Sequence, residues 1–172
     1  MRIPTICAAL VLTGCTSIAD MPNNQVGMAE LRFANGLPAG NVQLLRTSEQ
    51  LSVSVDVTGM TPGAHGFHLH TTGRCDGPDF TTAGGHLNPG DNSHGTMSAG
   101  GSHLGDLPNL QVGSRGTASA DLVVSRQAGS ALSDIFDADG TAVIVHANAD
   151  DYRTDPSGNA GARIACGVLR AT

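Results

Sequence analysis

The chain has 172 residues, enough for one domain with a real hydrophobic core, and its composition is not that of a disordered protein. Its formal net charge is −6, and every basic residue is an arginine. An acidic chain without a basic cluster excludes the usual electrostatic signature of proteins that bind nucleic acid or an anionic membrane surface.

Residues 1–14 have the pattern of an export signal. Arg2 supplies a positive charge, and the apolar run at 3–12 is too short to span a bilayer. The run ends in LTGC at 12–15, which resembles the lipobox of bacterial lipoproteins and implies that Cys15 becomes a lipidated first residue. The alternative is an ordinary secretory signal cleaved nearby. Thr16 directly follows Cys15. An Asp at this position would favour retention in the inner membrane, so the resemblance implies the outer membrane.

Cleavage before Cys15 would change the net charge to −7, because residues 1–14 contain Arg2 and no acid. Residues 15–25 lack periodicity, and we expect a flexible tether there, followed by a single domain at 26–172. Cleavage also removes Cys7, and lipidation uses Cys15. The two remaining cysteines, Cys75 and Cys166, predict a disulfide in an exported chain.

From residue 26 onward the pattern is that of β-strands. Short alternating runs occur at 28–34 and 41–46, and the clearest strand is 51–57, which is apolar at every odd position. A Gly/Pro turn at 59–63 leads into a strand that carries His68 and His70. Strand character returns at 117–125, 141–147 and 163–170, and no helical stripe appears, although 130–136 could form a turn. Seven or eight short strands predict an all-β sandwich or flattened barrel.

Residues 71–115 form a long segment with little apolar periodicity and many Gly, Asp, Asn and Ser. A loop of this length needs something other than a core to order it. It contains a cysteine, three histidines and Asp106, so a metal ion and a disulfide could order this loop in place of a hydrophobic core.

His68 and His70 share one face of their strand, because successive strand residues point to opposite faces. Six of the seven histidines, together with Asp106, follow a spacing typical of metal ligands. A single His-x-His pair could be a surface pair or a hydrogen-bonded core pair, but the whole series favours a metal site.

Six motifs then identify a resemblance: GFHLH at 66–70, GGHLNP at 84–89, HG at 94–95, HLGDL at 103–107, VHA at 145–147 and GNAGARIACGV at 158–168. In this order they resemble the copper,zinc superoxide dismutases of the bacterial exported type, over residues 26–172. The resemblance implies a Greek-key β-sandwich or flattened eight-stranded barrel with long metal-binding and electrostatic loops. It also implies superoxide as the substrate, with one copper and one zinc ion per subunit.

The resemblance implies two overlapping sets of metal ligands. The copper ligands would be His68, His70, His86 and His146. The zinc ligands would be His86, His94, His103 and Asp106. Four nitrogens suit copper, and three His with one carboxylate make a closed zinc site. His86 would bridge the two metals and take part in catalysis by accepting a proton when copper is reduced.

Five further residues gain roles from the resemblance. His65 would be structural, hydrogen-bonded near the copper site. Asp150 would link the ligands His68 and His94, although a solvated loop acid is the alternative because Asp151 and Asp155 are close in sequence. Arg163 would lie over the copper channel and attract superoxide; a surface ion pair is the alternative. Cys75 and Cys166 match the family disulfide.

The expected function is therefore dismutation of superoxide to oxygen and hydrogen peroxide. A periplasmic copper or zinc carrier on the same scaffold is the alternative, and a purely structural surface lipoprotein is a third hypothesis. We expect no nucleic-acid partner, and membrane contact only through a lipid anchor at Cys15. The expected location is the periplasmic side of the cell envelope, as a monomer or homodimer.

Overall fold

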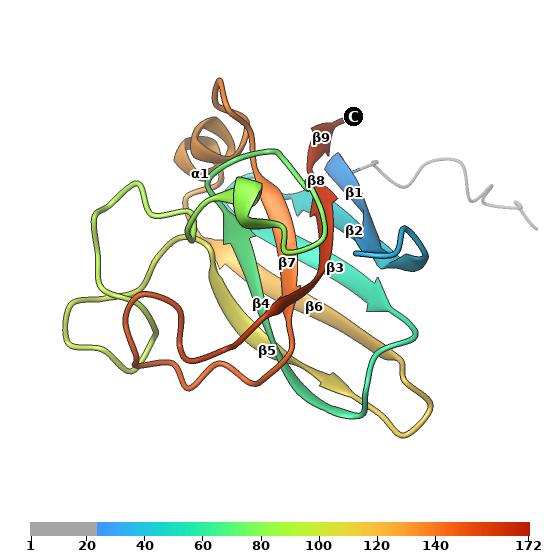
Figure 1. Cartoon of the computed structure of the whole chain (residues 1–172). Helices are drawn as coiled ribbons and strands as arrows, with labels where there is room; N and C mark the ends of the chain where they lie inside the picture. The colour runs from blue at the N-terminus through green and yellow to red at the C-terminus, as the bar shows by residue number, and fades with distance from the viewer. Residues whose placement is uncertain (1–23) are drawn as a thin grey trace, which may run out of the picture.

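The computed structural model describes residues 24–172, so the expected signal segment at 1–14 and most of the tether at 15–25 lie outside the described residues. Nine strands and one short helix make up the fold (Figure 1). The strands are β1 (Gln25–Phe33), β2 (Pro38–Arg46), β3 (Leu51–Val57), β4 (Gly63–His70), β5 (Asp106–Val112), β6 (Ala118–Ser125), β7 (Ala142–His146), β8 (Arg163–Val168) and β9 (Arg170–Ala171). The helix is α1 (Ala128–Ile135), and a 3-10 turn lies at Thr81–Ala83.

The strands form one antiparallel sheet in the order β5-β4-β7-β8-β1-β2-β3-β6, with the two-residue β9 paired to β1. The end strands β5 and β6 contact each other and are joined by a turn with a hydrogen bond from Gly113 N–H to Thr117 O. The result is a nearly closed eight-stranded barrel, as the sequence predicts.

The barrel interior holds the alternating apolar residues of the strands. On β3, Leu51, Val53 and Val55 are fully buried, as expected from their odd positions. On β4, Phe67 and Leu69 point into the same core. His68 and His70 therefore lie on the outer face of β4, because strand residues alternate sides. This face is nevertheless buried, since loops cover it.

Two sequence-based predictions were wrong. β5 lies inside the segment predicted to be a loop at 71–115. Its buried residues Leu107, Leu110 and Val112 do not alternate regularly, because a register shift interrupts the β4–β5 ladder. The helix α1 was also missed: its buried residues include two small alanines, Ala128 and Ala131, which give a weak apolar signal.

Two long connections cover the outside of β4 and β7. One runs from β4 to β5 and the other, at 147–162, from β7 to β8; both lie on the same side of the barrel in Figure 1. They are tied together by hydrogen bonds, including Met97 N–H to Tyr152 O and His94 N–H to the Asp155 carboxylate. No helix of residues 24–172 is long and apolar enough to cross a membrane.

Candidate metal centre

Strand register brings the predicted site residues together. His68 on β4 is paired with Asp106 on β5, and His146 on β7 is paired with Arg163 on β8. His70, at the end of β4, forms an isolated β-bridge with His86 from the long loop. Residues far apart in sequence thus become direct neighbours through the antiparallel ladder.

The predicted copper ligands form one cluster whose ligand atoms all lie within 4.8 Å of one another. All four side chains are buried. Each has one ring nitrogen without a hydrogen-bond partner among the described residues: His68 Nδ1, His70 Nε2, His86 Nε2 and His146 Nε2. Buried polar atoms are normally paired. Four unpaired nitrogens that converge on one point fit a metal ion with nitrogen ligands, as copper prefers.

The other ring nitrogen of each strand ligand is held by an acceptor. His70 Nδ1 donates to Gly84 O at 2.9 Å, and His146 Nδ1 donates to Gly161 O at 3.0 Å. His68 Nε2 donates to Asp150 Oδ2 at 2.8 Å. These bonds fix the tautomer, so the nitrogen facing the cluster carries a free lone pair.

Burial favours the neutral form of three imidazoles of the copper cluster, those of His70, His86 and His146. Burial, with the neighbouring histidines, lowers the pKa of His70 to about 2 and that of His146 to about 3. Burial also lowers the pKa of His86 to about 4, although the Asp106 carboxylate opposes the shift. A metal can therefore bind at neutral pH without displacing protons from charged imidazolium groups.

The predicted zinc ligands form a second cluster that shares His86. The Nδ1 atoms of the three histidines lie close to Asp106 Oδ1, at 2.8 Å for His86, 3.0 Å for His94 and 3.1 Å for His103. His94 Nδ1 makes no hydrogen bond among the described residues despite this distance. Ligand atoms around a tetrahedral zinc ion are about 3.3 Å apart, so the spacing fits zinc.

Asp106 is held in place by its second oxygen. Oδ2 accepts hydrogen bonds from Gly95 N–H at 2.8 Å and His103 N–H at 3.0 Å. Burial acts to raise the pKa of Asp106, but the contact with His86 and these main-chain donors outweigh it and hold the pKa well below its usual value. Asp106 is therefore an ionised ligand whose Oδ1 faces the zinc cluster.

Asp150 connects the two clusters. Its carboxylate accepts hydrogen bonds from His68 Nε2 at 2.8 Å and His94 Nε2 at 3.0 Å. Burial acts to raise its pKa, but these bonds and one from Tyr152 N–H outweigh it, so the pKa is lowered. His65 is not a member of either cluster; its Nδ1 donates to the carbonyl of His146 at 2.7 Å.

Arg163 lies at an opening beside the copper cluster. This opening has a volume of about 380 Å³, and His70, His86, His146 and Arg163 are among the residues that line it. The guanidinium donates to Phe80 O at 2.7 Å and Gly84 O at 2.6 Å. Among the described residues that line the opening, none is acidic, so an otherwise acidic protein presents a fixed positive charge there.

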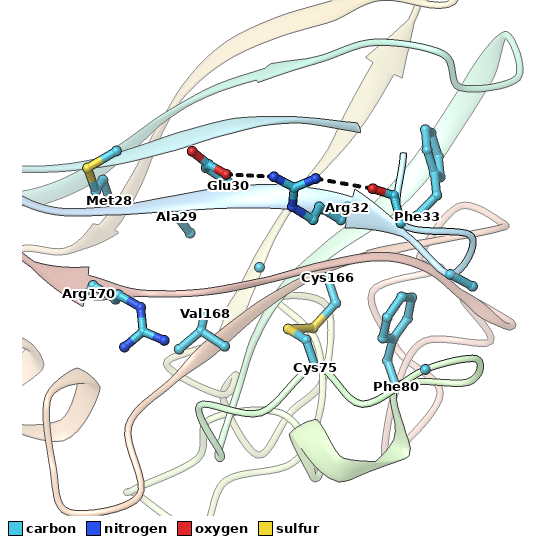
Figure 2. Close-up of a pocket in the computed structure, with 14 residues that line it drawn as sticks. Met28, Ala29, Glu30, Arg32, Phe33, Cys75, Phe80, Cys166, Val168 and Arg170 are labelled. Atoms are coloured by element: carbon cyan, nitrogen blue, oxygen red, sulfur yellow. Dashed lines mark hydrogen bonds and ion pairs between the residues drawn. A yellow bond between two sulfur atoms is a disulfide. The ribbon is translucent and has the colours of Figure 1, made fainter. Parts of the chain in front are cut away.

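The predicted disulfide is present, between Cys75 of the long loop and Cys166 of β8. Figure 2 shows this bond with Phe80 beside it. Because Cys75 lies shortly before Phe80 and Gly84, the disulfide anchors the segment whose carbonyls hold Arg163.

Two residues of the site were missed by sequence reasoning. Asn109 on β5 and Tyr152 in the 147–162 loop both bind Asp150. A lone Asn in a strand and a lone Tyr in a loop carry no spacing signal, so only the structure reveals them.

Comparison with known proteins agrees with this geometry. The family model described as copper/zinc superoxide dismutase matches residues 38–169. A Cu-Zn superoxide dismutase of Aquifex aeolicus is 36% identical over 146 residues, which cover 83% of this chain and 86% of the relative. The superoxide dismutase-like protein YojM of Bacillus subtilis is 43% identical over 141 residues, covering 78% and 70%.

Solved structures show the same fold. The crystal structure of a SOD-like protein from Bacillus subtilis has a TM-score of 0.77 and 40% identity, covering 83% of this chain and 97% of that one. The Cu/Zn superoxide dismutase from Brucella abortus has a TM-score of 0.68 and 29% identity, covering 83% and 98%. With both ligand clusters complete, the chain belongs to the copper/zinc superoxide dismutase family.

Proposed function

We propose that Arg163 and His86 are the catalytic residues of this dismutase, and that it works in the bacterial cell envelope. Copper, when bound by the four histidines, supplies the one-electron chemistry by which one superoxide is oxidised to oxygen and a second is reduced, with two protons, to hydrogen peroxide. The opening over His70, His86 and His146 supports these two catalytic roles, because Arg163 is the fixed cation that lines it.

Arg163 would bind and orient the substrate anion. Superoxide carries one negative charge, and the protein is acidic overall, so the attraction must be local. Charge guidance of the substrate is a known property of this enzyme family. Two hydrogen bonds to main-chain carbonyls hold the guanidinium beside the cluster, while the charge itself remains available to an anion.

His86 would hold and release a proton. Its Nε2 belongs to the copper cluster and its Nδ1 faces Asp106 in the zinc cluster. With copper held at Nε2 and zinc at Nδ1, neither nitrogen of His86 would keep a proton. Nε2, when no longer held by copper, could take up a proton and give it to the peroxide product, which is the mechanism that the family resemblance implies.

We also propose that residues 1–14 are removed as a lipoprotein signal, that Cys15 carries the lipid, and that residues 15–25 tether the domain at 26–172. The LTGC motif at 12–15 and the disulfide, which suits an oxidising compartment, support this. The periplasmic side of the outer membrane is the proposed location. Mass spectrometry of the mature N-terminus is the test; an unmodified N-terminus at another residue would contradict it.

Both ligand clusters are complete within one chain, so neither metal site needs a second subunit. We propose a monomer or a homodimer in which each subunit works alone.

The test of the catalytic proposal is superoxide decay by purified protein loaded with copper and zinc, measured beside its metal content. We expect fast decay with about one copper and one zinc per chain, a stoichiometry set by the two ligand clusters. Full metal content without decay would favour a copper or zinc carrier instead.

A further inference from the structure

The side chain of Asn109 makes two hydrogen bonds to the main chain of Asp150. Asn109 Nδ2 donates to Asp150 O at 2.9 Å, and Asp150 N–H donates to Asn109 Oδ1 at 2.8 Å. Asn109 lies on β5, three residues after the zinc ligand Asp106. One rigid strand of the barrel therefore carries a metal ligand and also sets the position of Asp150.

Tyr152 closes this arrangement into a ring of hydrogen bonds. Its hydroxyl accepts from Asn109 N–H at 2.9 Å, and its own N–H donates to Asp150 Oδ1 at 2.6 Å. Tyr152 has φ 61, a left-handed conformation that non-glycine residues rarely adopt. Such a conformation persists only where the surroundings hold it, and here the hydroxyl, the N–H and the carbonyl, which accepts from Met97 N–H, are all bonded.

Asp150 is the group through which this ring can reach both metal clusters. Its carboxylate accepts from His68, a copper ligand, and from His94, a zinc ligand, and all three side chains are fully buried. The orientation of these two imidazoles follows the position of the carboxylate, because each is held by a single hydrogen bond to it.

We propose that Asn109 and Tyr152 are positioning residues for both metal sites, acting through Asp150 on His68 and His94. The inference rests on the proposed metalloenzyme function, and it adds two residues outside the ligand sets. A structural role alone would predict that loss of either side chain lowers stability and leaves the metal geometry unchanged.

The experiment compares the Asn109→Ala and Tyr152→Phe variants of the mature protein with the unsubstituted mature protein. Zinc affinity is measured by chelator competition. Ligand geometry is measured by the visible spectrum of Co²⁺ in the zinc cluster and the EPR spectrum of Cu²⁺ in the copper cluster. Val53→Ala, in the barrel core of β3, is the control for lost stability alone.

We expect Asn109→Ala to weaken zinc binding by about tenfold, the lower end of the effect of groups that orient metal ligands, and to shift both spectra. Tyr152→Phe should cause a smaller change in the same direction. Val53→Ala should lower the melting temperature with unchanged spectra. Tyr152→Phe removes a single oxygen, so it keeps the test available if Asn109→Ala does not fold.

A double-mutant cycle with Asp150→Asn tests whether Asn109 affects the metal sites through Asp150. If Asn109 acts through Asp150, its effect on zinc affinity should largely disappear in the Asp150→Asn background. Native spectra in both single variants, or an effect that persists undiminished in that background, would overturn the proposal. Dismutation by the native protein is measured in parallel; its absence would contradict the enzymatic function alone, because positioning is judged from the metal spectra.

Discussion

Arg163 and His70 donate hydrogen bonds to the same acceptor, the carbonyl oxygen of Gly84, at 2.6 Å and 2.9 Å. One peptide group therefore fixes the position of the cation at the opening relative to a copper ligand. Gly84 itself has φ 75, and a Cβ there would lie 2.3 Å from the Thr71 hydroxyl. The geometry of this peptide depends on glycine.

Replacing Arg163 tests the role of the cation. Arg163→Ala should lower kcat/KM for superoxide by about tenfold at low ionic strength, because the local attraction is lost, and copper content should be unchanged. Arg163→Lys should give an intermediate rate, since lysine keeps the charge but lacks the planar guanidinium that donates to the carbonyls of Phe80 and Gly84. Stopped-flow rates at low and high salt provide the measurement. An unchanged rate in low salt would contradict the role.

His146→Ala removes a ligand of the copper cluster alone. We expect dismutation to be lost and zinc content to be retained, because His146 is not in the zinc cluster. Metal analysis of the purified variant, together with the superoxide assay, measures both effects. Retained activity would disprove the copper assignment.

Gly158→Ala tests the close packing around Asp150. A Cβ at Gly158 would lie 1.8 Å from Asp150 Oδ1 and 2.7 Å from His94 Nε2, so the carboxylate must move. We expect weaker zinc and copper binding, measured by chelator competition. Gly36→Ala is the matched control: Gly36 also has positive φ, but nothing lies within 4 Å of its Cβ position, so only the backbone cost of about 1–2 kcal/mol is expected. Equal metal affinity in both variants would contradict the prediction.

Cys75→Ser should lower the free energy of unfolding by up to about 4–5 kcal/mol, as the chain-entropy model gives for a loop of this length. The segment that presents Phe80 and Gly84 to Arg163 should also loosen, with weaker metal retention. Urea unfolding and metal content after dialysis against a chelator are the measurements. Metal content equal to that of the native protein would be inconsistent with this role.

The sequence predicted the barrel strands well where burial alternates, as on β3. It predicted both ligand clusters because six of the seven histidines, together with Asp106, follow metal-ligand spacing and the motifs around each ligand are specific. β5 was missed because its apolar residues are irregularly spaced, and α1 because its buried face is largely alanine. The sequence could not predict the roles of Asn109, Tyr152 and the Gly84 carbonyl, because these roles depend on contacts between segments distant in sequence.

The two clusters differ in where their ligands come from. His68, His70 and His146 lie on barrel strands, whereas His86, His94 and His103 all lie on the connection between β4 and β5. A chain that folds before it meets metal therefore has most of its copper nitrogens in place, while its zinc histidines still depend on a loop. Zinc capture would close that loop and deliver His86 to the copper cluster. Zinc bound first should therefore raise the affinity for copper, and by thermodynamic reciprocity bound copper should raise the affinity for zinc by the same factor.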